Sequence, residues 1–191
     1  MEGDASAVSF AGRLEHVHAT EAASEPMREL AEATLVAGVG IDGDRYATRR
    51  GTYSARHHID RQVTLIEAEV LEALARDHDL VIAPHEHRRN LTTRGVPVSH
   101  LVGRYFRVGG CLLYGGRLNV PCRYLEQLLG RPVFRPLIHR SGLNGRVVVG
   151  GTIRPGDPIV PVDRDELAAG PDAELVLAND RHGLEPPPEV W

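Results

Sequence analysis

The sequence predicts a mainly β fold, a barrel or a sandwich, with two or three short helices. Glycine and proline turn signals recur at close intervals along the chain, and short runs of β-prone residues lie between them. Short strands at this spacing are typical of barrels and sandwiches. Only two segments place apolar residues at the period of a helix. At 191 residues, the chain suits one domain with a core of its own.

Seven runs bounded by turn residues are expected to form strands. In chain order they are residues 13–19, 34–37, 90–93, 105–108, 111–114, 146–149 and 158–162. The first helix is expected at residues 66–77, where Ile66, Val70 and Leu74 fall on one face. The second helix is expected at residues 123–129, where apolar residues again recur at helical spacing.

The chain is expected to divide into a β domain and a tail. Residues 1–162 hold all of the strands and helices named above. Residues 163–191 are acidic and end in a proline-rich stretch. This composition favours a loosely packed extension, with at most one strand at residues 173–178.

Three features of the sequence indicate where the protein works. No apolar stretch approaches the ~20 residues that a membrane-spanning helix needs. The first residues, from Met1 to Ala5, contain neither the basic region nor the apolar core of a secretion signal. The chain has two cysteines, Cys111 and Cys122, in unlike surroundings. A cytoplasmic protein with reduced thiols is therefore expected.

The charged residues are unevenly distributed along the chain. The net charge is −4. Residues 45–154 have eighteen arginines against eight acidic residues, or +10, whereas each flank has nine acidic residues and two arginines, or −7. All 22 basic residues are arginine, whose guanidinium binds phosphate and carboxylate through paired hydrogen bonds. The middle of the chain therefore favours a small anionic ligand. Nucleic acid is not expected as a partner, because neither predicted helix is basic.

Cys122 is the main candidate for chemistry. It follows an apolar, strand-like run that stops at Pro121, and it precedes the predicted helix at residues 123–129. The positive end of the helix dipole and the charge of Arg123 both favour the thiolate, which is the form that attacks, carries sulfur or binds a soft metal. Cys111 lies inside an apolar run and is expected to be a small buried hydrophobe.

Residues 38–43 match the dinucleotide-binding pattern G-x-G-x-x-G, with Asp60 at about the expected distance. That motif binds a dinucleotide only where a helix follows and presents its N-terminus to a pyrophosphate. The residues that follow here have no apolar periodicity, and Gly51 interrupts them. We therefore expect no NAD, and instead a glycine-rich turn that presents Asp44 and Arg45.

The histidines give weaker signals for a metal or a catalytic base. Residues 57–58 and 85–87 contain paired histidines of the kind that zinc sites use. No third ligand is identifiable, and the two arginines at residues 88–89 would repel a cation, so no zinc is expected. His139 is a candidate base for the Cys122 thiol, although the sequence does not show that the two side chains meet.

Three groups of motifs resemble the MOSC family, which is named for the C-terminal domain of molybdenum-cofactor sulfurases. They extend over about residues 10–162. In chain order they are Gly-x-Gly-x-x-Gly-Asp-Arg-Tyr at residues 38–46 with residues 62–69, Arg-Arg-Asn-Leu-Thr-Thr-Arg-Gly at residues 88–95 with residues 101–109, and Pro-Cys at residues 121–122 with residues 139–147 and 151–157.

The resemblance implies a β-barrel domain with a mixed sheet, and it gives Cys122 a functional role. In family members, the matching cysteine is proposed to carry sulfur as a persulfide or to bind the molybdenum cofactor. In the mitochondrial amidoxime-reducing relatives it ligates molybdenum, and the enzyme reduces N-hydroxylated compounds. The resemblance thus implies either an oxidoreductase that depends on the molybdenum cofactor (molybdopterin) or a sulfurtransferase.

The same resemblance suggests which residues hold the ligand. Arg88 and Asn90 are similar to an Arg-x-Asn element near the cofactor of the amidoxime reducers. Arg45, Arg140 and Asn144 lie in other matching motifs and are further candidates for cofactor binding. The pterin of the cofactor bears a phosphate, which arginines bind well. A thiolate suits molybdenum as a ligand, and it is equally a nucleophile toward a persulfide.

Two departures from the family leave the function open. The protein is expected to be a stand-alone domain, without the pyridoxal-phosphate desulfurase domain of the sulfurases or the N-terminal β-barrel domain of the amidoxime reducers. Some relatives have a second cysteine where this chain has Asn119, so sulfur transfer needs an external partner, such as a cysteine desulfurase or a redox protein. The alternatives are a molybdenum-independent enzyme of small-molecule sulfur metabolism that uses Cys122, and a non-catalytic binding module.

Overall fold

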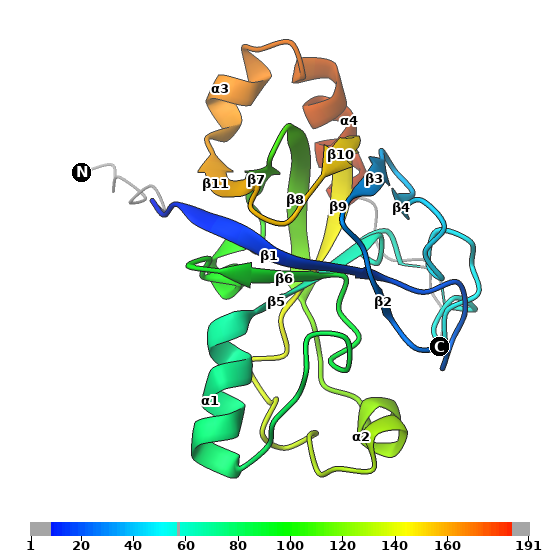
Figure 1. Ribbon diagram of the computed structural model, residues 1–191. Coiled ribbons are helices and arrows are strands. Elements are labelled where there is room, and N and C mark those ends of the chain that lie inside the picture. The colour runs from blue at the N-terminus through cyan, green and yellow to red at the C-terminus, as the bar shows by residue number, and fades with distance from the viewer. Residues whose placement is uncertain (1–8, 57, 185–191) are drawn as a thin grey trace.

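Seven strands of the computed structural model close into a barrel, with helices beyond both ends (Figure 1). The structure describes residues 9–56 and 58–184. The barrel strands are β1 (Gly12–Ala19), β5 (Val63–Glu67), β6 (Leu91–Arg94), β7 (Tyr105–Val108), β8 (Cys111–Leu118), β9 (Leu143–Val149) and β11 (Pro158–Val162). They follow the order β11–β7–β8–β9–β5–β6–β1, and pairing of β1 with β11 completes the ring. The predicted β-barrel is therefore confirmed.

One pair of barrel strands is parallel, and the chain connection explains why. β5 and β6 pair in parallel, whereas the other six barrel pairs are antiparallel. Parallel strands need a crossover connection, and helix α1 (Ala68–His78) supplies it here. The sheet is therefore mixed, as the family resemblance implied.

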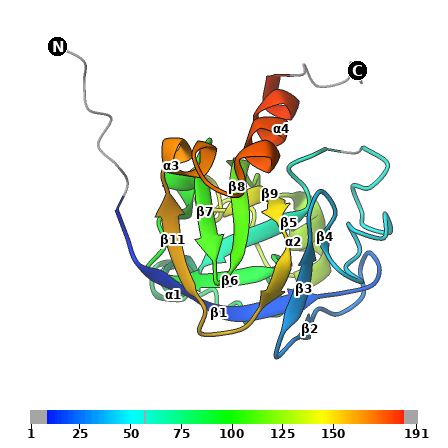
Figure 2. The same cartoon turned by 90° about the horizontal axis from the view of Figure 1, so that it is seen from above.

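Four short strands lie outside the ring. β2 (Arg28–Glu29) pairs with the end of β1. The other three form a small sheet of their own, with β3 in the middle, and this sheet runs beside the barrel (Figure 2). They are β3 (Ala33–Val36), β4 (Gly40–Ile41) and β10 (Gly151–Ile153).

The helices gather at the two ends of the barrel. α1 and α2 (Arg123–Leu129) lie at one end, and α3 (Arg164–Ala168) and α4 (Ala173–Leu184) lie at the other (Figure 1). A short 3-10 helix, η1 (Val98–Leu101), follows β6. Among the residues that the structure describes, no helix has the length and apolar character required to span a membrane.

Alternating side chains fill the barrel. In β7, Phe106 and Val108 are fully buried in the interior, whereas Tyr105 packs outside, against the C-terminal helices. In β8, Cys111 and Leu113 belong to the interior cluster. Burial of each large apolar side chain contributes roughly 1.5–3 kcal/mol, so the barrel interior is a packed core. Cys111 is the buried hydrophobe that the sequence predicts, and burial raises the pKa of its thiol.

All seven predicted strands are present, and β2, β4, β5 and β10 are additional. The omission of β5 has a physical cause. Residues 63–66 are all buried, so the run lacks the alternation that marks a half-exposed strand. Ile66 consequently belongs to β5 rather than to the helix, which begins at Ala68. The helix predicted at residues 123–129 is confirmed as α2.

The prediction for the C-terminal segment was wrong. Residues 173–178 form the first half of helix α4 rather than a strand. Val176 of α4 and Leu167 of α3 are buried against Tyr105 of β7, and the Tyr105 hydroxyl donates a hydrogen bond to Asp180 (2.6 Å). These tertiary contacts favour the helix, and the segment is packed on the barrel rather than loosely attached. The proline-rich stretch at residues 185–191 lies outside the described residues.

Candidate functional site

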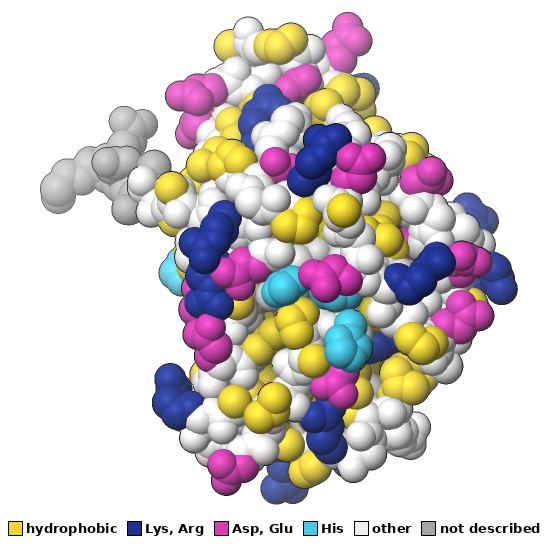
Figure 3. Space-filling view, viewed as in Figure 1, with side chains coloured by type: hydrophobic (Ala, Val, Ile, Leu, Met, Phe, Trp, Pro, Cys, Tyr) yellow, Lys and Arg dark blue, Asp and Glu magenta, His cyan; other side chains and the backbone are white. Residues whose placement is uncertain are grey.

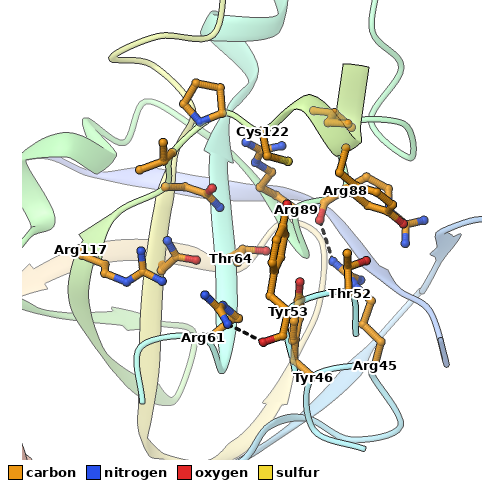
Figure 4. A pocket seen from close by; sticks show the side chains of 16 residues that line it. Arg45, Tyr46, Thr52, Tyr53, Arg61, Thr64, Arg88, Arg89, Arg117 and Cys122 are labelled. Atoms are coloured by element: carbon orange, nitrogen blue, oxygen red, sulfur yellow. Dashed lines mark hydrogen bonds between the residues drawn. The ribbon is translucent and has the colours of Figure 1, made fainter. Parts of the chain in front are cut away.

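A cavity of about 290 Å³ lies beside the start of α2 (Figure 4). Its walls come from segments far apart in the sequence: the loop between β4 and β5, β5 itself, the residues before β6, the end of β8, the connection to α2, the start of α2, and β9. The lining residues are Arg45, Tyr46, Thr52, Tyr53, Arg61, Thr64, Arg88, Arg89, Arg117, Asn119, Val120, Pro121, Cys122, Tyr124, Leu125 and Asn144.

Cys122 lies at this cavity as the N-cap residue of α2. Its backbone is extended (φ −132°, ψ 147°), which is the usual conformation of the residue that caps the start of a helix. The Asn119 N–H donates to the Gly142 carbonyl (2.7 Å), which ties this connection to the start of β9. The thiol is half-buried against the apolar cluster of α1 and α2. A local sequence signal, a proline followed by a helix, therefore places the sulfur at the cavity.

Five arginines line the cavity: Arg45, Arg61, Arg88, Arg89 and Arg117. None of the described lining residues is acidic. Two unit charges about 4 Å apart near a protein surface interact with roughly 4 kcal/mol at an effective dielectric constant of about 20. A group of cations without lining carboxylates therefore favours a negatively charged ligand.

Arg89 is a deeply buried cation beside the thiol. Its guanidinium donates hydrogen bonds to the carbonyl and hydroxyl oxygens of Ser141 and to the carbonyl of His87. Burial lowers the pKa of Arg89 to about 10, and the neighbouring Cys122 opposes that shift. Arg89 therefore keeps its charge at neutral pH.

Arg45 anchors the backbone of Arg88 on one side of the cavity. The Arg45 guanidinium donates to the Arg88 carbonyl (2.9 Å) and to Asp44 Oδ1 (3.2 Å), and it lies 4.9 Å from the centre of the Tyr46 ring. Arg88 has a φ of +66°, a left-handed conformation that residues with a side chain seldom adopt and that is found more often at functional sites. Burial is the main cause that lowers the pKa of Arg88, and the positive charge of Arg45 lowers it further.

Tyr53 connects the thiol to another arginine. Burial raises the pKa of Tyr53 to about 12, and a hydrogen bond with Cys122 adds to the shift. The Arg61 guanidinium lies 5.5 Å from the centre of the Tyr53 ring and 6.0 Å from that of Tyr46, in range for cation–π attraction. The Tyr53 phenol therefore keeps its proton at neutral pH and is a hydrogen-bond donor next to the sulfur.

The structure brings four of the six residues predicted for the site to one cavity. Cys122, Arg45, Arg88 and Asn144 line it, whereas Asn90 and Arg140 do not.

Asn90 has a structural role instead. It is buried, and its Oδ1 accepts hydrogen bonds from the hydroxyl (2.8 Å) and the N–H (3.2 Å) of Thr64. Its Nδ2 donates to Asp44 Oδ1 (3.2 Å) and to the His18 carbonyl (3.2 Å). Both ends of the amide are thus occupied in joining β1, β5 and β6, and neither end is left for a ligand.

Arg140 lies away from the cavity for a similar reason. Its Nε donates to the Pro136 carbonyl (2.6 Å), and its other nitrogen lies 2.8 Å from His78 Nε2 at the end of α1. These contacts direct the guanidinium toward α1 instead of toward Cys122.

Two other sequence signals also lie away from the cavity. Residues 38–43 form the turn and second strand of the β3–β4 hairpin, and they present Asp44 and Arg45 as predicted. His139 is exposed and does not line the cavity, so the structure does not bring it to Cys122 as a base.

The paired histidines do not form a common ligand face. His87 is buried, accepts a hydrogen bond from the Arg89 N–H (2.9 Å) and bonds to the Thr92 hydroxyl (2.9 Å). His85 is exposed in the preceding turn, and His57 lies outside the described residues. In the part of the chain that the structure describes, no three His, Cys, Asp or Glu side chains are arranged to hold a metal ion.

The sequence reasoning missed three cavity arginines, Arg61, Arg89 and Arg117. Arg89 is the middle residue of the matched Arg-x-Asn motif, so a prediction that considered every residue of the motif would have included it. Arg117 lies on β8 beyond the predicted end of that strand at residue 114. Arg61 is in a loop and has no local signal.

The residues of the cavity fit a ligand that brings its own metal donors. Cys122 is the only sulfur-bearing residue among the described lining residues, and no histidine or carboxylate joins it there. A cofactor that holds its metal in an organic framework needs from the protein one soft donor and cations for its phosphate. Cys122 and the cavity arginines match those two requirements.

Known proteins share this architecture. The family model of the MOSC domain matches residues 18–160. The structure of the YUAD protein from Bacillus subtilis is similar, with a TM-score of 0.69 and 17% identity over 82% of this chain and 99% of that one. YiiM from Geobacillus stearothermophilus has a TM-score of 0.61 and 15% identity over 89% and 85% of the two chains. YiiM from Escherichia coli has a TM-score of 0.59 and 19% identity, over 82% of this chain and 70% of that one. Identities this low show a shared fold. Among the curated proteins, no sequence matches this chain.

Proposed function

Because the chain belongs to the MOSC domain family, we propose that its cavity binds the molybdenum cofactor, with Cys122 as the protein ligand to the metal. The observation that carries this proposal is the position of Cys122 at a cavity lined by five arginines, with no acidic residue among the described lining residues. A thiolate is a soft donor, and guanidinium groups bind phosphate. One cavity therefore offers groups for both ends of a phosphorylated metal cofactor.

The residues nearest the sulfur have separate tasks in this proposal. Arg89 is a buried cation that offsets negative charge on the sulfur and on the bound ligand. Tyr53 keeps its phenolic proton and lines the same cavity, where it would donate a hydrogen bond to the sulfur. When bound, the cofactor supplies two-electron reduction, and N-hydroxylated compounds are the substrate class that the family resemblance suggests.

A persulfide carrier is the second candidate, and the position of Cys111 favours it. Cys111 is buried inside the barrel, so a persulfide on Cys122 meets no second thiol of the chain that would displace its sulfur. In the transfer, the Cys122 thiolate attacks the terminal sulfur of a donor persulfide. The new S–S bond forms as the donor S–S bond breaks, and the donor leaves as a thiolate. The partner for this step is an external sulfur donor such as a cysteine desulfurase.

Metal analysis combined with intact-mass measurement tests both candidates. Wild type and Cys122→Ala are purified from a host that makes the molybdenum cofactor, with Cys111→Ala as the control for a thiol outside the cavity. Molybdenum bound by the wild type and the control, but lost in Cys122→Ala, supports the cofactor protein. A gain of one sulfur mass that depends on Cys122, without molybdenum, supports the carrier.

Two results would refute both candidates and leave the alternatives. If the wild type contains neither molybdenum nor extra sulfur and Cys122→Ala loses an activity that the wild type has, the protein is a molybdenum-independent enzyme. A non-catalytic module binds its ligand equally well with and without the Cys122 thiol.

A further inference from the structure

Arg117 differs from its neighbours in the cavity by its hydrogen bonding. Its Nε–H is buried and has no hydrogen-bond partner. By contrast, Arg45, Arg88 and Arg89 each donate to an oxygen of the protein. The rest of the Arg117 guanidinium lines the cavity and makes no hydrogen bond or ion pair with the described residues, so a ligand there meets donors that no protein group occupies.

Arg61 is fixed where it reinforces the charge of Arg117. One of its nitrogens donates to the carbonyls of Tyr53 (2.8 Å) and Arg56 (2.7 Å), and the Tyr53 contact is drawn in Figure 4. These acceptors are neutral, so they orient the guanidinium without cancelling its charge. Burial lowers the pKa of Arg117, and the charge of Arg61 lowers it further. Two cations thus face the same part of the cavity.

The carboxylate nearest to this pair is already engaged. Asp60 raises the pKa of Arg117, but its Oδ1 accepts a hydrogen bond from Arg146 Nε (2.5 Å) and its Oδ2 lies 3.5 Å from His58. Asn144, which pairs with Arg117 across β8 and β9, contributes only a neutral amide. Within the described part of the chain, the two positive charges are therefore left without a dedicated counter-ion.

We propose that Arg117 and Arg61 bind the phosphate monoester of the ligand whose other end meets Cys122. The inference rests on the proposed function, because it uses the same cavity. In Figure 4, Arg117 lies on the side of Thr64 away from Arg45 and Arg88. Arg61, Arg117 and Cys122 line one cavity of about 290 Å³, so a single ligand can meet the two arginines and the sulfur.

This assignment differs from the one expected from the sequence. The motif resemblance named Arg88 and Asn90 first and added Arg45, Arg140 and Asn144 as further candidates, and it named neither Arg117 nor Arg61. Arg88 already donates to the Glu25 carbonyl. Arg117, whose guanidinium donates to no described residue, is the better phosphate donor because binding there costs no existing hydrogen bond.

Titration of the metal-free, nitrogen-15-labelled protein with inorganic phosphate tests this inference. The Nε–H resonance of Arg117, identified by its loss in Arg117→Gln, is expected to shift and then saturate. Arg117→Gln should weaken phosphate binding about tenfold or more, because a charge-assisted hydrogen bond is lost. Arg61→Gln should weaken it in the same direction.

Two control variants isolate the effect. Arg154→Gln removes an exposed arginine that pairs with Glu32 outside the cavity, and it should bind phosphate like the wild type. Arg76→Gln removes another exposed arginine, which pairs with Asp77 outside the cavity, and it should also bind phosphate like the wild type. If phosphate binds but neither molybdenum nor persulfide is found, the proposed function fails and this subsite stands.

Thermal unfolding without phosphate gives a second test. Arg117→Gln should unfold at the same temperature as the wild type or higher, because an unsatisfied donor and its repulsion from Arg61 are removed. A purely structural arginine would instead cause a loss of stability. Unchanged phosphate affinity in Arg117→Gln, or a lower unfolding temperature of its ligand-free form, would overturn the inference while leaving the cofactor proposal open.

Discussion

Arg94 and Arg117 are both close to the ends of barrel strands, but their charges are balanced in different ways. Arg94, at the end of β6, contacts the carboxylates of Glu15, Glu69 and Glu72. Arg117, at the end of β8, has no carboxylate partner among the described residues, and its Nε–H is unsatisfied. Basic and acidic side chains alternate over β1 and α1 in Figure 3, whereas the described residues of the cavity wall are cationic without an acidic one.

The difference lies in what anchors each arginine. Arg94 is held by carboxylates, which neutralise it. In the cavity, Arg61, Arg88 and Arg89 are anchored by backbone carbonyl oxygens. Carbonyls fix the direction of a guanidinium but leave its full charge available. The cavity is therefore a preorganised anion site, and the number of arginines in the sequence does not by itself reveal it.

Arg45 is the exception among the cavity arginines, because it pairs with Asp44, a buried carboxylate outside the lining, and removal of Asp44 should have the largest effect on stability. Its buried carboxylate pairs with Arg45 and accepts hydrogen bonds from the N–H groups of Thr20 and Tyr46. Asp44→Ala leaves the Arg45 charge buried without its partner, which should cost about 3–5 kcal/mol of unfolding free energy. Urea unfolding measures this loss.

Asp42→Ala is the matched control for Asp44, because Asp42 is exposed two residues earlier. This change should alter the unfolding free energy by less than about 0.5 kcal/mol. Equal losses in the two variants would show that the buried ion pair does not hold the cavity wall together.

Two buried histidines, His18 and His87, should make the stability of the protein depend on pH. Burial lowers the pKa of His18 from 6.5 to about 4, and burial also lowers the pKa of His87. Between those two pH values the unfolded chain binds a proton that the folded chain does not, so stability should fall as the pH drops from 6.5 to 4. The cavity arginines stay charged over this range.

Urea midpoints at several pH values between 7 and 4 check this behaviour. His18→Gln removes one of the two titrating groups, so its stability should fall less steeply with acid than that of the wild type. A pH dependence identical in the two proteins would contradict the role assigned to His18.

Arg94→Gln should have the smallest effect of these changes. Its partly exposed pairs with Glu15, Glu69 and Glu72 are screened by water, and such pairs contribute about 0–1 kcal/mol each. The variant should lose about 1 kcal/mol in urea unfolding and bind phosphate like the wild type. A loss of phosphate affinity in this variant would remove the distinction between paired and cavity arginines.

Local signals made part of this structure predictable. Pro121 followed by a helical period was enough to place Cys122 at the start of α2, and a short β-prone run between turn residues identified β7. β5 was missed because burial on both faces removes its alternation. The length of β8, and with it the position of Arg117, was underestimated because two glycines interrupt the apolar run.

The site residues depended on contacts that no local pattern contains. Arg89 and Asn90 are neighbours, yet Arg89 lines the cavity while Asn90 joins three strands. The left-handed conformation of Arg88 lies just before them and helps to set which side chain turns to the cavity. The charge of Arg117 is left unpaired because distant segments decide which carboxylates lie near it. The one nearby, that of Asp60, pairs with Arg146 instead.

The central claim is that one cavity holds an anionic cofactor between Cys122 and Arg117. Native mass spectrometry of protein purified from a host that makes the molybdenum cofactor tests it most directly. We predict a cofactor-bound species in the wild type and in Arg154→Gln, none in Cys122→Ala, and occupancy reduced about tenfold in Arg117→Gln. Equal occupancy in all four proteins, or none in the wild type, would contradict the claim.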